Sequence, residues 1–176
     1  MNVAVIVNTN STTATSISAT TNPICNGNST TLSVVGGTLG SGGAWQWYSG
    51  SCGGTFVGTG VSVSVSPSST TTYFVRAEGT CNITSCVSLI ITVNSLSTAP
   101  GSATATVNPL CQGNSTTPGI VGGSLGAGAN WQWYSTSCGV GSVGSGLTLA
   151  VTPASTTTYY VRAEGACNTT SCVSIT

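Results

Sequence analysis

Short runs in which apolar and polar residues alternate follow one another along the chain, separated by stretches rich in glycine, serine and threonine. The alternation is clearest in VSVSV at 61–65 and in WQWYS at 45–49. A period of two residues is that of a β-strand with one buried face, and no segment shows a helical period. The first half of the chain is therefore expected to form strands near residues 13–20, 29–35, 44–49, 55–58, 61–66, 72–78 and 86–93.

The chain repeats itself at a fixed offset of 86 residues. WQWYS at 45–49 returns unchanged at 131–135, and the stretch 22–90 matches 108–176 at 44 of 69 positions without a gap. Similarity this high and free of insertions predicts two copies of one fold and suggests that both belong to a longer array.

Seven short strands per copy, joined by Gly-rich and PSSTTT turns, are typical of an immunoglobulin-like (Ig-like) sandwich. We therefore expect an all-β chain of tandem Ig-like β-sandwiches held by disulfides. Trp45 and Trp47 lie on one face of the third strand, and Trp131 and Trp133 repeat them. These residues are expected as core aromatics, one of each pair taking the place of the buried Trp of such sandwiches. The alternative is that the rings stack on sugars.

The two copies are out of phase with the chain. Subtracting one period aligns 1–7 (MNVAVIV) with 87–93 (VSLIITV), the last strand of a copy. The expected division is a last-strand segment at 1–7, a first Ig-like repeat at 8–94 and a second at 95–176 whose last strand is incomplete. The strand of the first segment comprises Val3, Ala4, Val5, Ile6 and Val7. It belongs either to a preceding repeat of a longer array or to the open sandwich of a neighbouring chain, as in donor-strand polymers.

Charge is almost absent, since Arg76, Glu78, Arg162 and Glu164 are the only charged residues and there is no Lys, Asp or His. A neutral chain offers no basic surface to nucleic acid, and no stretch approaches the ~20 apolar residues of a membrane span. Acid–base, nucleophilic and metal chemistry lack their usual residues. We expect no enzyme activity, no catalytic or metal site and no cofactor. Arg76 and Glu78 should form an ion pair on one face of a strand, a contact between repeats or subunits being the alternative.

Eight cysteines in a Ser/Thr-rich chain indicate an oxidising compartment, and hence a secreted protein at or beyond the cell surface. Four cysteines per copy allow three pairings. Strand placement puts the first two cysteines of a copy at one end of the sandwich and the last two at the other, and cross-pairing would have to span the long axis. The predicted disulfides are Cys25–Cys52, Cys81–Cys86, Cys111–Cys138 and Cys167–Cys172.

Asn-X-Ser/Thr sequons mark candidate positions for N-glycosylation. They occur at Asn10, Asn28, Asn82, Asn114 and Asn168.

Four motifs carry a resemblance to a known family: C-x-G-x-S-x-x-L, W-x-W-Y-S-x-S-C-G-G, S-P-S-S-T-T-T-Y-F-V-R-A-E-G and C-x-x-x-x-C-V-S. Together they resemble the Ig-like repeats of very large secreted proteins of Bacteroidetes, such as gliding-motility surface adhesins and other type IX secretion cargo. The resemblance implies surface filaments, adhesion or spacing, with no catalytic residues. The second copy departs from the first at Pro118–Gly119, where the first has Leu32–Ser33. This change predicts a less regular second strand.

Three functions compete. The leading hypothesis is a structural or adhesive segment of an extracellular filament or cell-surface stalk, in which identical modules or subunits follow one another head to tail. A second is a filament subunit assembled by strand exchange through Val3–Val7. A third is a glycan-binding module that uses Trp45, Trp47 and Tyr48, with surface glycans as its partners. No nucleic acid and no membrane partner is expected.

Overall fold

A computed structural model describes residues 3–176 and divides the chain into two units. We call Met1–Asn94 module 1 and Ser95–Thr176 module 2. Every regular element over residues 3–176 is a β-strand, which confirms the all-β prediction. No helix in this range is long and apolar enough to cross a membrane. Met1 and Asn2, which the sequence places in the first segment, lie outside the described residues.

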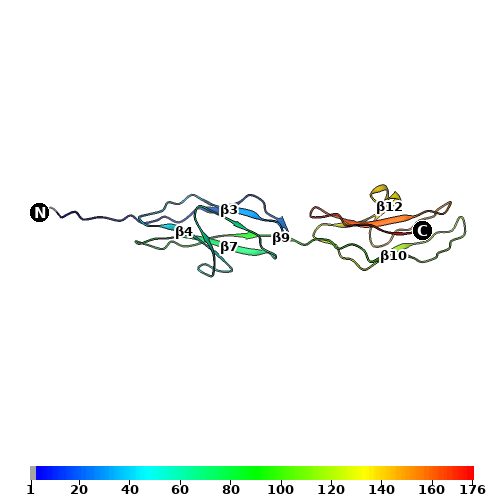
Figure 1. Ribbon diagram of the computed structural model, residues 1–176, viewed down its shortest axis with the longest axis horizontal. Coiled ribbons are helices and arrows are strands. Elements are labelled where there is room, and N and C mark those ends of the chain that lie inside the picture. Colours follow the sequence, from blue (N-terminus) through cyan, green and yellow to red (C-terminus); the bar gives the residue numbers. More distant parts are fainter. Residues whose placement is uncertain (1–2) are drawn as a thin grey trace. The chain divides into compact units, whose positions relative to one another are not determined.

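Module 1 is built from two antiparallel sheets and a short parallel pair. Its strands are β1 (Ser16–Ala19), β2 (Ile24–Cys25), β3 (Thr30–Val35), β4 (Ala44–Ser49), β5 (Thr55–Thr59), β6 (Ser62–Val65), β7 (Thr71–Glu78), β8 (Val87–Ile91) and β9 (Val93–Asn94). One sheet has the order β1-β3-β6 and the other β5-β4-β7-β8, and β2 pairs with β9 in parallel. The layer of β3 faces the layer of β4 and β7 (Figure 1). The seven longer strands lie where the alternating pattern predicts them.

The core of module 1 fills the space between these two layers. Leu32, Trp47, Val75 and Ile91 are fully buried. Along β7 buried and partly exposed residues alternate, because successive side chains of a strand point to opposite faces of the sheet. The outer face of this four-stranded sheet is therefore free to carry polar side chains.

Module 2 repeats the architecture less regularly. Its strands are β10 (Ser102–Ala105), β11 (Pro118–Val121), β12 (Asn130–Ser137), β13 (Val140–Ser145), β14 (Tyr159–Glu164) and β15 (Val173–Ile175). They form a two-stranded sheet, β10-β11, and a four-stranded sheet, β13-β12-β14-β15. The residues equivalent to β6 make only isolated bridges, Gly119 with Thr148 and Thr116 with Val151.

Pro118 explains the weaker pairing in module 2. It stands where Leu32 continues the ladder between β3 and β6 in module 1. Proline has no N–H, so it removes one donor from the ladder, although its carbonyl still accepts from the Leu149 N–H at 2.9 Å. The irregular second strand expected from the Pro–Gly pair is thus present.

Candidate functional site

The structure pairs the cysteines differently from the prediction made on the sequence. Cys52 bonds to Cys86 in module 1 and Cys138 to Cys172 in module 2, each with Cα atoms 5.9 Å apart. The predicted bonds Cys25–Cys52, Cys81–Cys86, Cys111–Cys138 and Cys167–Cys172 are therefore wrong. Each observed disulfide closes a loop with a sequence separation of 34 residues, which stabilises the fold by about 4 kcal/mol through the lost entropy of the unfolded chain.

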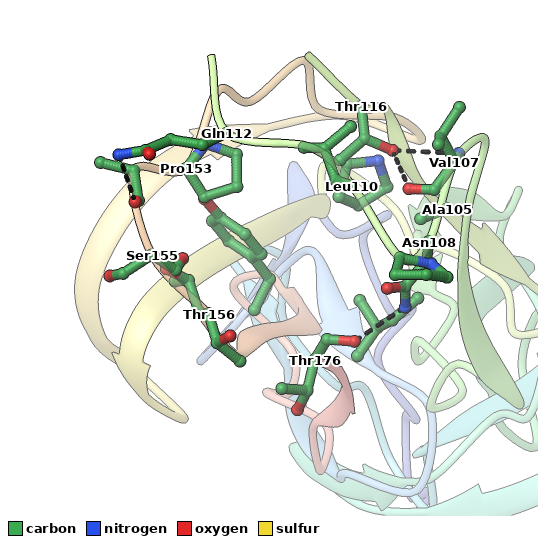
Figure 2. A pocket seen from close by; sticks show the side chains of 16 residues that line it. Ala105, Val107, Asn108, Leu110, Gln112, Thr116, Pro153, Ser155, Thr156 and Thr176 are labelled. Carbon is green, nitrogen blue, oxygen red and sulfur yellow. Dashed lines mark hydrogen bonds between the residues drawn. The ribbon is translucent and has the colours of Figure 1, made fainter. Parts of the chain in front are cut away.

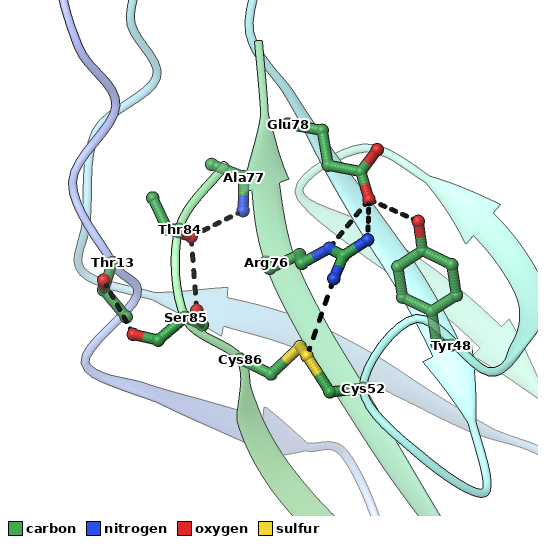
Figure 3. Close-up of a disulfide and its surroundings, with 9 residues drawn as sticks. All are labelled: Thr13, Tyr48, Cys52, Arg76, Ala77, Glu78, Thr84, Ser85 and Cys86. Carbon is green, nitrogen blue, oxygen red and sulfur yellow. Dashed lines mark hydrogen bonds and ion pairs between the residues drawn. A yellow bond between two sulfur atoms is a disulfide. The ribbon is translucent and has the colours of Figure 1, made fainter. Parts of the chain in front are cut away.

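The prediction failed because the turn between β4 and β5 does not stay at the end of the sandwich. The ladder between these strands shifts register between Trp47 and Tyr48, and the turn carries Cys52 across to β7 (Figure 3). Its sulfur lies 3.8 Å from Nη1 of Arg76, in the second half of β7. Cys86 directly precedes β8, the neighbour of β7, and so meets Cys52 over the outer face of the sheet.

The other four cysteines fall into two pairs of repeat equivalents. Cys81 and Cys111 are exposed free thiols. Their equivalents one period away, Cys167 and Cys25, are disulfide-bonded. A position that is oxidised in one copy is therefore a thiol in the other.

A charged cluster lies beside the Cys52–Cys86 disulfide. Oε1 of Glu78 accepts hydrogen bonds from the Tyr48 hydroxyl and from Nε of Arg76, the latter at 2.8 Å (Figure 3). Nη2 of Arg76 lies 2.8 Å from the same oxygen, and the guanidinium carbon lies 5.1 Å from the centre of the Tyr48 ring. The expected ion pair on one face of the strand is present, and both of its side chains are about three-quarters buried.

Module 2 contains the same cluster. Tyr134 and Arg162 both donate to Oε1 of Glu164, and the guanidinium lies over the Tyr134 ring. Nη1 of Arg162 lies 3.8 Å from the sulfur of Cys138. In both modules, therefore, the charged cluster connects two strands and a turn on the outer face of a sheet.

The hydrogen bonds of the cluster shift the ionisation of its members. The hydrogen bond from the Tyr48 hydroxyl is the main cause that lowers the pKa of the Glu78 carboxyl below its usual range, and the hydrogen bond from Arg76 is the second. The same bond to Glu78 raises the pKa of Tyr48. In module 2 burial is the main cause that raises the pKa of Tyr134, and its hydrogen bond to Glu164 adds to the shift. The carboxylate of Glu78 therefore keeps its charge to a lower pH than an ordinary glutamate, and the tyrosine hydroxyls keep their protons to a higher pH than an ordinary tyrosine.

Asparagine side chains tie the N-terminal end of each module to its body. Oδ1 of Asn82 accepts from the Ser11 N–H at 2.8 Å, and its Nδ2 donates to the Ser11 carbonyl at 2.9 Å. Asn168 makes the same two bonds, of 2.9 Å each, to Ser97. We call each pair an asparagine clamp.

The clamps bear on the predicted glycosylation positions. The Nδ2 atom that an N-linked glycan would take is already a donor in Asn82 and Asn168. The sequons at Asn10, Asn28 and Asn114 are exposed, and glycosylation there stays a prediction. The same tripeptide thus marks a part-buried structural bond at two positions and an exposed asparagine at three.

The tryptophans do not offer faces to a sugar. Trp47 and Trp133 are fully buried, and Trp45 and Trp131 are 4% and 3% exposed. The indole N–H groups of the fully buried pair donate to the carbonyls of Gly60 and Gly146. The glycan-binding hypothesis needed exposed rings, so these residues do not support it.

Module 2 contains a groove of about 390 Å³ (Figure 2). Its apolar wall includes Ala105, Val107, Leu110, Pro153, Tyr159 and Ile175. In module 1 the equivalent of this space holds Ile91, which is fully buried, and β9, which pairs with β2. Tyr73 there is 6% exposed, whereas its equivalent Tyr159 is only half-buried.

Val3–Val7 make no strand within the described residues 3–176. The valines and the isoleucine of this segment are 84–87% exposed, and the segment extends away from the sheets of module 1 (Figure 1). Assignment of this segment to another repeat or another chain stays a prediction.

The chain between the two modules is short. Asn94 is still paired with Cys25 at the end of module 1, while Ser97 is already held by the clamp of module 2. The Ser95 carbonyl accepts from the Ala127 N–H at 3.3 Å. Leu96, between Ser95 and Ser97, is exposed.

Residues 3–176 contain no cluster of side chains that could bind a metal ion. No three His, Cys, Asp or Glu side chains in this range gather as a metal site would require. The only carboxylates of the sequence, Glu78 and Glu164, are engaged in the charged clusters.

The sequence matches the family described as "Ig-like domain CHU_C associated" over residues 12–94 and again over 98–176. The chain belongs to this family of Ig-like domains. The match confirms the resemblance to the Ig-like repeats of large secreted Bacteroidetes proteins. No curated protein matches the sequence.

Solved structures resemble these two Ig-like domains in fold. Murine CEACAM1b is 17% identical with a TM-score of 0.54, over 90% of this chain and 94% of that one. A two-domain fibronectin type III segment of chicken tenascin is 10% identical with a TM-score of 0.39, over 93% and 97% of the two chains. Three domains of the outer capsid protein Hoc of bacteriophage RB49 are 13% identical with a TM-score of 0.42, over 93% and 58%.

The likeness to CEACAM1b shows the fold alone. Disulfide-bonded Ig-like domains in tandem are consistent with a structural or adhesive part of an extracellular or cell-surface protein. Families with this fold are typically non-enzymatic.

Proposed function

We propose that this chain is a load-bearing spacer of an extracellular filament or cell-surface stalk, in which Ig-like modules follow one another head to tail. The observation that carries the proposal is the tight anchoring of both ends of a module. The asparagine clamp holds Ser11 at the N-terminal end, and the β2–β9 pair holds Asn94 at the C-terminal end. Tension on the backbone therefore reaches the folded sheets without first drawing out a slack linker.

The disulfides support the same function, since they limit how far a module extends. The Cys52–Cys86 bond removes 34 residues of sequence separation from the length that force can draw out. At about 3.5 Å per extended residue, and with the Cα atoms held 5.9 Å apart, an oxidised module releases about 110 Å less chain than a reduced one.

Single-molecule pulling on the full chain tests this function. We expect two unfolding events, each about 110 Å longer in reductant than in its absence, at forces that fall when the clamp is removed by Asn82→Ala. The substitution Asn28→Ala is the matched control, because this exposed sequon residue has no role in the clamp. Equal unfolding forces for Asn82→Ala, Asn28→Ala and the unchanged protein would contradict a load-bearing role for the anchored ends.

Strand exchange is a second candidate, favoured by the exposed apolar side chains of the segment Val3–Val7. This segment repeats the pattern of the last strand of module 1 one period earlier, and the groove of module 2 offers it an apolar wall. Val5 is equivalent to Ile91, whose side chain is buried, while Ala4 is equivalent to Ile90, which is 54% exposed. A segment of another copy bound here would place alternate side chains in the groove, as an added strand does.

Analytical ultracentrifugation of the full chain separates this candidate from the first. Under strand exchange we expect concentration-dependent association that Val5→Asp abolishes and Ala4→Asp preserves, because only the first puts a charge into the groove. If the two variants associate to the same extent, or if the unchanged chain stays monomeric at millimolar concentration, strand exchange is wrong and the spacer proposal is untouched.

A further inference from the structure

Each module has one exposed thiol, Cys81 in module 1 and Cys111 in module 2. Cys81 precedes Asn82, whose side chain clamps Ser11 at the N-terminal end of module 1. Cys111 is the equivalent of Cys25, which pairs with Asn94 at the C-terminal end of its module. Each module thus has one cysteine beside the point where the chain enters and one beside the point where it leaves.

Both positions form disulfides elsewhere in the same chain. Cys167, one period after Cys81, is disulfide-bonded, and so is Cys25, one period before Cys111. The turns at these residues make matching backbone hydrogen bonds in the two copies. Next to Cys81 and Cys167, the Gly79 N–H donates to the Asn82 carbonyl and the Gly165 N–H to the Asn168 carbonyl, each at 3.1 Å. The Asn28 N–H donates to the Cys25 carbonyl at 2.9 Å, and the Asn114 N–H donates to the Cys111 carbonyl at 3.1 Å. The thiols of Cys81 and Cys111 therefore lie in turns whose equivalents in the other copy carry a disulfide-bonded cysteine.

We propose that Cys111 of one copy and Cys81 of the next form a disulfide that joins successive copies of this chain covalently. The inference rests on the proposed head-to-tail arrangement and adds a covalent bond between successive copies. Since the cysteine at the C-terminal end of one copy meets the cysteine at the N-terminal end of another, the link has a direction, and it can continue from copy to copy.

The reaction consumes an oxidant of the disulfide class. The thiolate of one cysteine attacks a sulfur of a small disulfide such as oxidised glutathione, releasing one thiolate and forming a mixed disulfide. The second cysteine attacks the protein sulfur of that mixed disulfide and releases the other thiolate. Two cysteine thiols are oxidised and lose two electrons and two protons, and one glutathione disulfide is reduced to two glutathione thiols.

The direction of the bond gives a sharp test in a glutathione redox buffer, read on non-reducing gels. The unchanged chain is expected to form a ladder of dimers, trimers and larger species that reductant collapses to monomer. Cys81→Ser alone and Cys111→Ser alone should each stay monomeric, because each retains a thiol at one end only. Mixing the two variants should give dimers and nothing larger, through Cys111 of the first and Cys81 of the second.

Two outcomes would overturn the proposal. One is dimerisation of Cys81→Ser or Cys111→Ser alone to the same extent as their mixture, which would show indiscriminate thiol coupling. The other is an unchanged chain that stays monomeric in the redox buffer at any concentration. Sedimentation of the double variant Cys81→Ser/Cys111→Ser distinguishes this failure from failure of the head-to-tail arrangement. If the double variant still associates, the head-to-tail arrangement stands and only the disulfide between copies is excluded.

Discussion

Removing the Cys52–Cys86 disulfide of module 1 is the change whose effect on stability the structure determines best. The double variant Cys52→Ser/Cys86→Ser deletes the disulfide without leaving an unpaired thiol behind. The bond has a sequence separation of 34 residues, and a loop of this length constrains the unfolded chain by about 4 kcal/mol. For a domain of this size the melting temperature should fall by roughly 15–30 °C.

The chain provides its own reference in this experiment. Module 2 keeps Cys138–Cys172 and should unfold as before, so thermal unfolding should separate into two transitions of which one has moved. Cys81→Ser is the matched control, since it removes an exposed thiol, and it should change stability by no more than about 0.5 kcal/mol.

The result that refutes this reasoning is specific. If Cys81→Ser destabilised module 1 as much as the double variant does, the pairing Cys81–Cys86 would be restored and the observed geometry would be wrong. A double variant with unchanged unfolding would show that the Cys52–Cys86 bond does not constrain the module.

Three further outcomes are expected. Trypsin cuts this chain only after Arg76 and Arg162, so the observed disulfides should hold the three fragments together on a non-reducing gel, whereas the pairing predicted from the sequence would release them. Asn82→Ala should lower the free energy of unfolding of module 1 by about 1–3 kcal/mol, through the unpaired backbone groups it leaves, while Asn28→Ala should be neutral by the same urea titration. Because the pKa of Glu78 is lowered in the folded state, stability should be constant above the usual carboxyl range and fall as pH drops through the folded pKa, since the unfolded chain then binds more protons. Glu78→Gln should flatten the acid limb of a stability–pH profile, and an unchanged limb would contradict the assignment.

Strand positions were predictable because alternation records which face of a strand is buried. VSVSV at 61–65 became β6, and the Arg76–Glu78 pair shares a face as a spacing of two requires. The irregular strand at Pro118 was also predictable, because a proline within a strand lacks the N–H that a ladder hydrogen bond needs.

The cysteine pairing was not predictable, because it depends on how a turn folds back over a sheet. The path of residues 50–54 follows from a register shift within the β4–β5 ladder and from glycines with positive φ, such as Gly53 at +74°. Neither leaves a periodic signal. The asparagine clamp was hidden in the same way, since Asn82 lies 71 residues from Ser11 and its tripeptide is that of a glycosylation sequon.

Immunoelectron microscopy of the native protein on intact cells tests the proposed function most directly. Antibodies against these modules should decorate fibres or stalks outside the cell, with beads of module size repeating along each fibre. Labelling confined to the cell interior, or to separate two-lobed particles that never join end to end, would contradict a head-to-tail extracellular spacer.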